Sequence, residues 1–158
     1  MDAGNLERHA TWLQGNLDIA MTWASAYIGR PWTDERCCGY YFAVIQQEVF
    51  GRSVDGEKIA SVIGALSAAR IMAAIFASSD AAAEFGYRAT ADPMDGDAVF
   101  LSQRTRPHHI GTVALIGGKF HVLHTLEGIG TILSDRLDLR ANGWRTAGFW
   151  TWADEKIK

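Results

Sequence analysis

The spacing of apolar residues changes from helical to strand-like after about residue 86. The apolar residues over 5–28, over 37–50 and over 56–76 predict three helices, of which the first is amphipathic and the third, rich in alanine and isoleucine, is well buried. Gly51 directly follows the second of these segments and is typical of a helix C-terminus. Ser78-Ser79-Asp80 favours the start of a short fourth helix that ends near residue 85.

Short apolar runs separated by turn residues follow from residue 97 onward. They predict strands at residues 98–101, 109–116, 119–126, 131–133 and 147–152, with Gly117-Gly118 as a hairpin turn. Helices followed by an antiparallel meander define the α+β class. We therefore expect N-terminal helices packed on an antiparallel β-meander in a single domain of 158 residues, helical over about 5–86 and β over about 97–152.

The composition argues against several classes of protein. Apolar residues make up 48% of the chain and charged residues 21%, as in an ordinary globular protein. A formal net charge of -3 gives no electrostatic reason to expect nucleic acid or a membrane as a partner. No run approaches the roughly 18 apolar residues of a membrane span, and the N-terminus lacks the pattern of a secretory signal. We expect the protein to be made in the cytoplasm.

The only two cysteines, Cys37 and Cys38, lie where a charged loop gives way to the second predicted helix. A thiol in the first turn of a helix lies beside unpaired backbone N–H groups and the positive end of the helix dipole, which favour the thiolate. Two adjacent cysteines do not make a disulfide framework, so we expect free thiols. The alternative is that both are small, buried apolar residues.

Four of the five histidines fall inside or next to the predicted hairpin. With a two-residue turn, His109 faces Leu126 and Gly111 faces His124. His109 and His124 then lie on one face as diagonal neighbours, roughly 7–8 Å apart, while His121 points to the other face. A base near a thiol, held by a second polar group, is the arrangement of an activated nucleophile. His109 is the candidate base, and His124 is the candidate orienting group.

Cysteine and histidine also suggest zinc. Structural zinc sites take ligands in pairs two to four residues apart, each pair on one loop or helical turn. Adjacent Cys37 and Cys38 fit this spacing poorly, and so does the pair of His109 and His124. We expect neither a metal ion nor another cofactor.

Five ordered segments of the chain resemble the motifs of the NlpC-like cell-wall peptidases, which are papain-like cysteine hydrolases of bacteria and phages. Asp-Cys-x-Gly and Phe-Gly of that family correspond to Arg36-Cys37-Cys38-Gly39 and Val49-Phe50-Gly51. A Gly-Asp pair opening a strand corresponds to Gly96-Asp97. The catalytic His-Val-Gly-Ile corresponds to His109-Ile110-Gly111-Thr112, and the polar third residue to His124. The resemblance covers about residues 17–150.

The resemblance implies a papain-like fold and hydrolysis of an amide bond in peptidoglycan stem peptides by a Cys-His-His triad. The branch encoded with phage tail genes is most similar, followed by interbacterial amidase toxins. These imply peptidoglycan peptide as substrate, phage tail proteins or a cognate immunity protein as partners, and action on the periplasmic cell wall after delivery. The alternatives are a non-catalytic phage tail or assembly protein that retains the fold and a cysteine-dependent acyl transferase.

The sequence departs from the family pattern at the nucleophile. Arg36 stands where an aspartate usually precedes the cysteine, and the cysteine is doubled. The spacing to Gly39 favours Cys37, whereas counting back from Gly51 favours Cys38. Both therefore stay candidates, with Cys38 ranked first.

Three further residues are candidates for substrate binding. Tyr40 and Tyr41 follow the cysteines and can line a cleft, although tyrosines on a buried helix commonly serve as core. Arg106, in the loop before His109, can meet a substrate carboxylate, although a solvated charge at the rim is the alternative.

Overall fold

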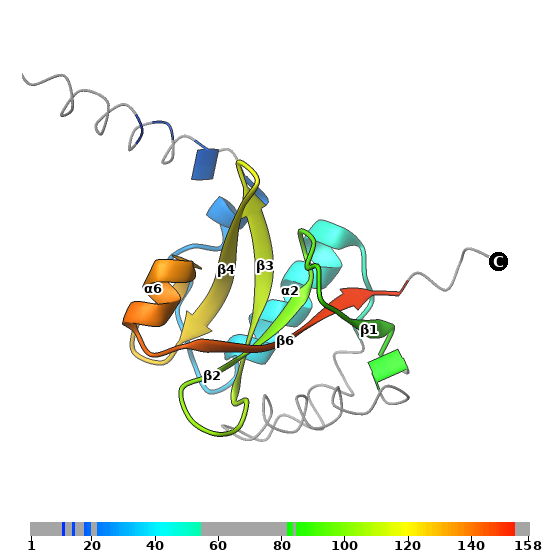
Figure 1. Cartoon of the computed structure of the whole chain (residues 1–158). Coiled ribbons are helices and arrows are strands. Elements are labelled where there is room, and N and C mark those ends of the chain that lie inside the picture. Colours follow the sequence, from blue (N-terminus) through cyan, green and yellow to red (C-terminus); the bar gives the residue numbers. More distant parts are fainter. Residues whose placement is uncertain are drawn as a thin grey trace, which may run out of the picture.

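The structure, a computed structural model, describes residues 22–54 and 85–153 together with residues 11, 14, 18, 19, 82 and 83. It has an α+β fold in which an N-terminal helix packs on a six-stranded antiparallel sheet (Figure 1). Within the described ranges, no helix is both long and apolar enough to cross a membrane. The elements, in chain order, are η1 (Trp23–Ala26), α2 (Cys38–Phe50), β1 (Tyr87–Thr90), β2 (Ala98–Ser102), β3 (His109–Ile116), β4 (Lys119–Leu126), β5 (Gly130–Asp135), α6 (Arg136–Ala141) and β6 (Arg145–Trp152).

The sheet has the strand order β1-β6-β2-β3-β4-β5. Strands β2 to β5 form the meander expected from the sequence, and Gly117 and Gly118 form its tight turn with φ values of 57° and 74°. Strand β6 does not extend this meander. It returns across the sheet and pairs with β2 on one side and β1 on the other.

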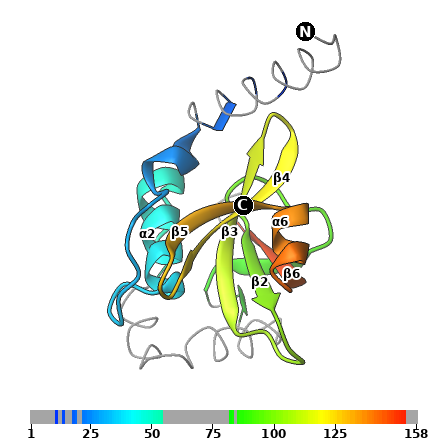
Figure 2. The same cartoon turned by 90° about the vertical axis from the view of Figure 1, so that its left-hand side faces the viewer.

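Helices α2 and α6 lie on opposite faces of the sheet, as Figure 2 shows. On one face, Phe42 of α2 packs in a buried cluster with Phe100 and Ile110. On the other face, Leu139 of α6 packs with Val99 and other strand residues. Side chains alternate between faces along a strand, so each central strand contributes to both layers of the core.

A buried polar network fixes helix α2 to the start of strand β2. Gln46 is fully buried, and its amide donates to the carbonyl of Gly96 at 2.9 Å. The hydroxyl of Tyr87 donates to the amide oxygen of Gln46 at 2.9 Å. Gly51 ends the helix in the left-handed conformation, with φ of 63°. These bonds satisfy polar groups that would otherwise be costly to bury.

The structure confirms the expected helix at the cysteines and the five expected strands. Two elements of the structure were not predicted from the sequence. Strand β1 is only four residues long, and α6 is a six-residue helix whose start is stabilised by a capping box of Asp135 and Asp138. The helices expected at 56–76 and at 78–85 lie almost wholly outside the described residues, as does most of the one expected at 5–28. In the last of these, the described final turn is a 3-10 helix.

Replacing Gly111 by alanine is expected to destabilise the sheet. A Cβ atom at this position would lie 2.6 Å from Cγ1 of Val122 and 3.1 Å from Cβ of His124. Such overpacking costs about 1–3 kcal/mol of unfolding free energy, measurable by chemical denaturation. Leu115→Ala, at an exposed position of the same strand, is the control and should cost less. Equal losses in the two variants would contradict the expectation.

Candidate active site

Three neighbouring strands bring together a chain of buried polar side chains. Nε2 of His109 on β3 lies 2.9 Å from Nδ1 of His124 on β4. Nε2 of His124 lies 2.9 Å from Oγ of Ser134 on β5. The three residues are only 5%, 3% and 4% exposed. The predicted pairing of the two histidines is confirmed. Ser134 was not predicted, although the register places it close to the histidine on the neighbouring strand.

Burial keeps both imidazoles neutral. It is the main cause that lowers the pKa of His109 well below its usual value, with neighbouring His124 and His108 adding to the effect. Burial also lowers the pKa of His124 to about 4. In one arrangement of protons, His109 donates from Nε2 to His124, which donates from Nε2 to Ser134. Nδ1 of His109 then carries a free lone pair and can act as a base.

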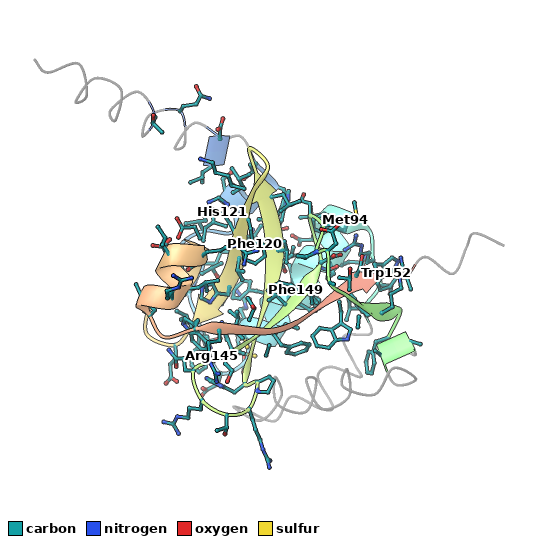
Figure 3. The ribbon with its side chains drawn as sticks, in the orientation of Figure 1. Met94, Phe120, His121, Arg145, Phe149 and Trp152 are labelled. Carbon is teal, nitrogen blue, oxygen red and sulfur yellow. The ribbon has the colours of Figure 1, made fainter. Side chains whose placement is uncertain are left out.

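Trp144 covers the histidines. Its ring centroid lies 4.9 Å from that of His109 and 6.3 Å from that of His124. On the same face, the rings of Phe120 and Phe149 pack with centroids 5.8 Å apart (Figure 3). This aromatic layer excludes water and accounts for the low exposure of the imidazoles. The sequence marks Trp144 only as an aromatic residue, and its position depends on the short helix α6 before it.

The two cysteines occupy the start of α2. Cys37 is the N-cap residue, Cys38 is the first helical residue, and both are half-buried free thiols. A hydrogen bond from Cys38 is the main cause that lowers the pKa of Cys37 to about 5, and backbone N–H groups of Tyr40, Gly39 and Cys37 itself also contribute. The same bond is the main cause that raises the pKa of Cys38, followed by burial and the charge on Cys37. The pair therefore shares one proton at neutral pH.

Cys38 is the sulfur that faces strand β3. The backbone N–H of Ile110, the residue after His109, points at it. The ladder between β3 and β4 runs from Thr112 paired with Leu123 to Ile116 paired with Lys119, so Ile110 lies outside that ladder. The thiol pair thus lies at the end of the sheet where the histidines lie.

The imidazoles project toward the face of the sheet that carries α6, whereas α2 packs on the other face. Within the described residues, His109 bonds to His124 and neither cysteine sulfur is hydrogen-bonded to either ring. The structure therefore brings a thiol to the strand of His109. It does not bring the sulfurs and the imidazoles together, because Ile110 points toward α2 and its neighbour His109 points to the opposite face.

The three candidate substrate-binding residues differ in exposure. Tyr41 is 4% exposed, and its hydroxyl donates to the carbonyl of Pro31 at 2.9 Å, so it anchors the loop before the cysteines. Tyr40 is 37% exposed. Arg106 is also exposed, on a loop whose carbonyl oxygens at Arg104 and Arg106 lie 2.6 Å and 2.8 Å from the hydroxyl of buried Ser102. Tyr40 and Arg106 are the two that a substrate can reach.

A surface pocket of about 430 Å³ lies in the loop directly before the cysteines. Its lining residues are Pro31, Thr33, Asp34, Glu35 and Arg36. The sequence showed only a short irregular segment here. The pocket supplies acidic, basic and apolar surface from the residues that directly precede the thiol pair in the chain.

Among the described residues, no group of three or more His, Cys, Asp or Glu side chains is arranged to bind a metal ion. His121 pairs with Ala114 and points to the face opposite His124, as expected. His108 contacts Trp144 at 5.3 Å between centroids but takes no part in the buried chain of hydrogen bonds.

No protein-family model, curated protein or solved structure matches the chain. The resemblance of the motifs to NlpC-like peptidases stays a prediction.

Alkylation should titrate the thiolate at the helix start. The rate of modification of Cys37 by iodoacetamide is expected to rise with pH around a midpoint near 5, because its pKa is about 5. In Cys38→Ala the stabilising hydrogen bond is lost, and the midpoint should rise by about one pH unit or more. Peptide mapping by mass spectrometry measures both rates.

Cys38→Ser is the matched control, since its hydroxyl can still donate to Cys37. Its midpoint should lie below that of Cys38→Ala. A midpoint near the free-thiol value of about 8.5 in the wild type would contradict the expectation.

Acid should weaken the fold through the buried histidines. Their pKa values lie below the usual value of about 6.5, so the unfolded chain binds more protons and stability falls as the pH drops from about 6.5 toward 4. In His124→Asn, the slope of the unfolding free energy against pH should decrease by up to about 1.4 kcal/mol per pH unit. Denaturation at several pH values measures it, with His121→Asn as control. An unchanged slope in His124→Asn would show that His124 does not titrate as described.

Proposed function

We propose that the protein is a papain-like cysteine hydrolase of the NlpC type that cleaves an amide bond in peptidoglycan stem peptides. One observation carries the proposal. A free thiol at a helix N-terminus faces Ile110, the residue after His109. His109 is hydrogen-bonded to a second histidine, His124. Thiol, base and orienting group are the three components that nucleophilic catalysis by cysteine requires.

The remaining motif residues support the resemblance because they have structural reasons to be where they are. Gly96 has φ of 86°, and a Cβ atom there would lie 2.6 Å from the ring of Phe50. Asp97 is fully buried and accepts a hydrogen bond from the backbone N–H of Met94 at 2.7 Å. The Phe-Gly and Gly-Asp motifs thus meet in space and hold helix and sheet together.

The proposed reaction requires a rearrangement at the start of β3, because His109 lies on the α6 face in this structure. Once its Nδ1 meets the attacking thiol, His109 takes the thiol proton. The sulfur adds to the amide carbonyl, and the imidazolium then protonates the leaving amine. His124 accepts the hydrogen bond from Nε2 of His109 and stabilises its charged form, while Ser134 fixes the tautomer of His124. Water hydrolyses the thioester and regenerates the thiol.

The free N–H groups of the first turn of α2 are proposed to bind the oxyanion. The N–H groups of Gly39 and Tyr40 already point at the sulfur of Cys37. Such groups stabilise developing negative charge without reorganisation.

Cys38 is the proposed nucleophile because its sulfur faces the strand of His109. Cys37 is the second candidate because it is the sulfur that is ionised at neutral pH. Proton transfer along their shared hydrogen bond moves the charge from one to the other, so separate variants are needed to assign the attack.

The pocket at residues 31–36, with Tyr40 and Arg106, is the proposed binding surface for the stem peptide. Asp34 and Glu35 suit a peptide amine, and the arginines suit a carboxylate. Phage tail proteins or a cognate immunity protein remain the proposed partners, with action on the periplasmic wall after delivery. The placement of the thiol helix and the imidazoles on opposite faces of the sheet favours a non-catalytic tail protein as the second candidate. Nothing in the geometry favours an acyl transferase over the hydrolase, and the following assay separates all three.

Purified protein is incubated with peptidoglycan fragments, and products are identified by mass spectrometry. We expect cleaved stem peptides. Cys38→Ala should abolish turnover, whereas Cys37→Ala should retain it, and His109→Ala should lower kcat by about 10²–10⁴-fold. Ser134→Ala should cause a smaller loss with a shifted pH profile. Thr131→Val is its matched control, since it removes a buried hydroxyl contact to Thr125 on the same two strands.

New cross-links in place of cleavage would show a transferase. An unchanged substrate, together with thiols whose alkylation is insensitive to His109→Ala, would show a scaffold. If neither single cysteine variant lowers turnover, the nucleophile assignment is wrong.

A further inference from the structure

Hydrolysis needs only one sulfur, which leaves the second cysteine without a role. Both thiols are free and half-buried, and their sulfurs are hydrogen-bonded to each other. The loop directly before them is exposed from Thr33 to Arg36 and borders the surface pocket. Small solutes can therefore approach Cys37 from solvent, whereas Cys38 packs against the apolar core.

The two cysteines suit different steps of a thiol oxidation. One suits the cysteine that a peroxide oxidises, and the other suits the cysteine that then forms a disulfide with it. Cys37 lies at the helix cap, where N–H groups of the first turn surround its sulfur. Thiolates are the form that peroxides oxidise, whereas protonated thiols react slowly. Cys38 holds its proton and lies in contact with the first sulfur. A sulfenic acid formed on Cys37 would have a thiol within reach at once.

We propose that Cys37 and Cys38 form a reversible oxidation site, in which a hydroperoxide oxidises Cys37 and Cys38 closes a disulfide between the two neighbours. This inference is independent of the proposed hydrolase, because it concerns the oxidation state of the pair and can be measured without substrate. It gives the doubled cysteine a function that a single cysteine cannot supply.

The chemistry balances with hydrogen peroxide as oxidant. The Cys37 thiolate attacks one oxygen, the O–O bond breaks, and hydroxide leaves to give a sulfenic acid. The Cys38 sulfur then attacks the Cys37 sulfur, the S–O bond breaks, and the hydroxyl leaves as water with the Cys38 proton. The two sulfurs together lose two electrons, and the peroxide is reduced to one water and one hydroxide, which takes a proton from solvent to become the second water.

The product is expected to be easily reduced. Neighbouring Cα atoms across a trans peptide are about 3.8 Å apart, which is shorter than the usual minimum of about 4.4 Å for a disulfide. Such strained disulfides are readily reduced by thiols. Closing the ring also displaces the Cys37 sulfur from the N–H groups of Gly39 and Tyr40, so oxidation alters the first turn of α2.

The test uses the full chain, reduced and then exposed to stoichiometric hydrogen peroxide, followed by alkylation and mass spectrometry. Wild-type protein is expected to lose two hydrogen atoms and both alkylation sites within one monomer, and dithiothreitol should restore them. Cys38→Ser should instead stop at the sulfenic acid, trapped by dimedone on Cys37. Cys37→Ser should react with peroxide at least about tenfold more slowly than the wild type.

Three results would overturn the proposal. They are a dimedone adduct as the main product in the wild type, a disulfide found only between two chains, and equal peroxide reactivity of Cys37→Ser and wild type. Because the wild type alone distinguishes the first two, the test does not depend on variants folding. If stem peptides are cleaved but no disulfide forms, the oxidation proposal fails and the hydrolase proposal stands. If the disulfide forms but no stem peptide is cleaved, the hydrolase proposal fails and the oxidation proposal stands.

Discussion

The hydrogen bond between Nε2 of His109 and Nδ1 of His124 ties the candidate site to the fold. It joins two adjacent strands beside the point where their ladder ends at Thr112 and Leu123. The bond can form only if β3 and β4 keep one register, since a slip of one residue would send one ring to the other face. The tight turn at Gly117 and Gly118 therefore determines whether the site exists at all.

Helix α2 connects this sheet to the thiols by fixing both of its own ends. At its C-terminal end, Gln46 binds the backbone of Gly96 before β2. At its N-terminal end, Cys38 meets the backbone N–H of Ile110 on β3. Between them, Phe42 and Ile45 pack into two buried clusters. The position of the sulfur is thus determined by core packing along the whole helix and not by the loop that precedes it.

The sequence predicted the features that depend on local patterns. Alternating apolar residues and a glycine turn were enough to find the hairpin and to pair His109 with His124. It did not reveal Ser134, whose role depends on the register of a third strand, or Trp144, which is positioned by a short helix that hydrophobic periodicity cannot detect. The sequence left open whether Tyr40 and Tyr41 line a cleft or serve as core, because the two are chemically alike and only the helix rotation separates them.

The place of β6 has a consequence for the order in which the sheet assembles. Its partners β1 and β2 lie next to each other in the chain, yet β6 separates them in the sheet. Strand β1 has β6 as its neighbour, with Tyr87 opposite Trp152. Contacts this distant along the chain form late in folding because loop closure must precede them. The meander of β2 to β5 is therefore able to assemble first, and the aromatic residues of β6 complete the sheet by joining β1 to it.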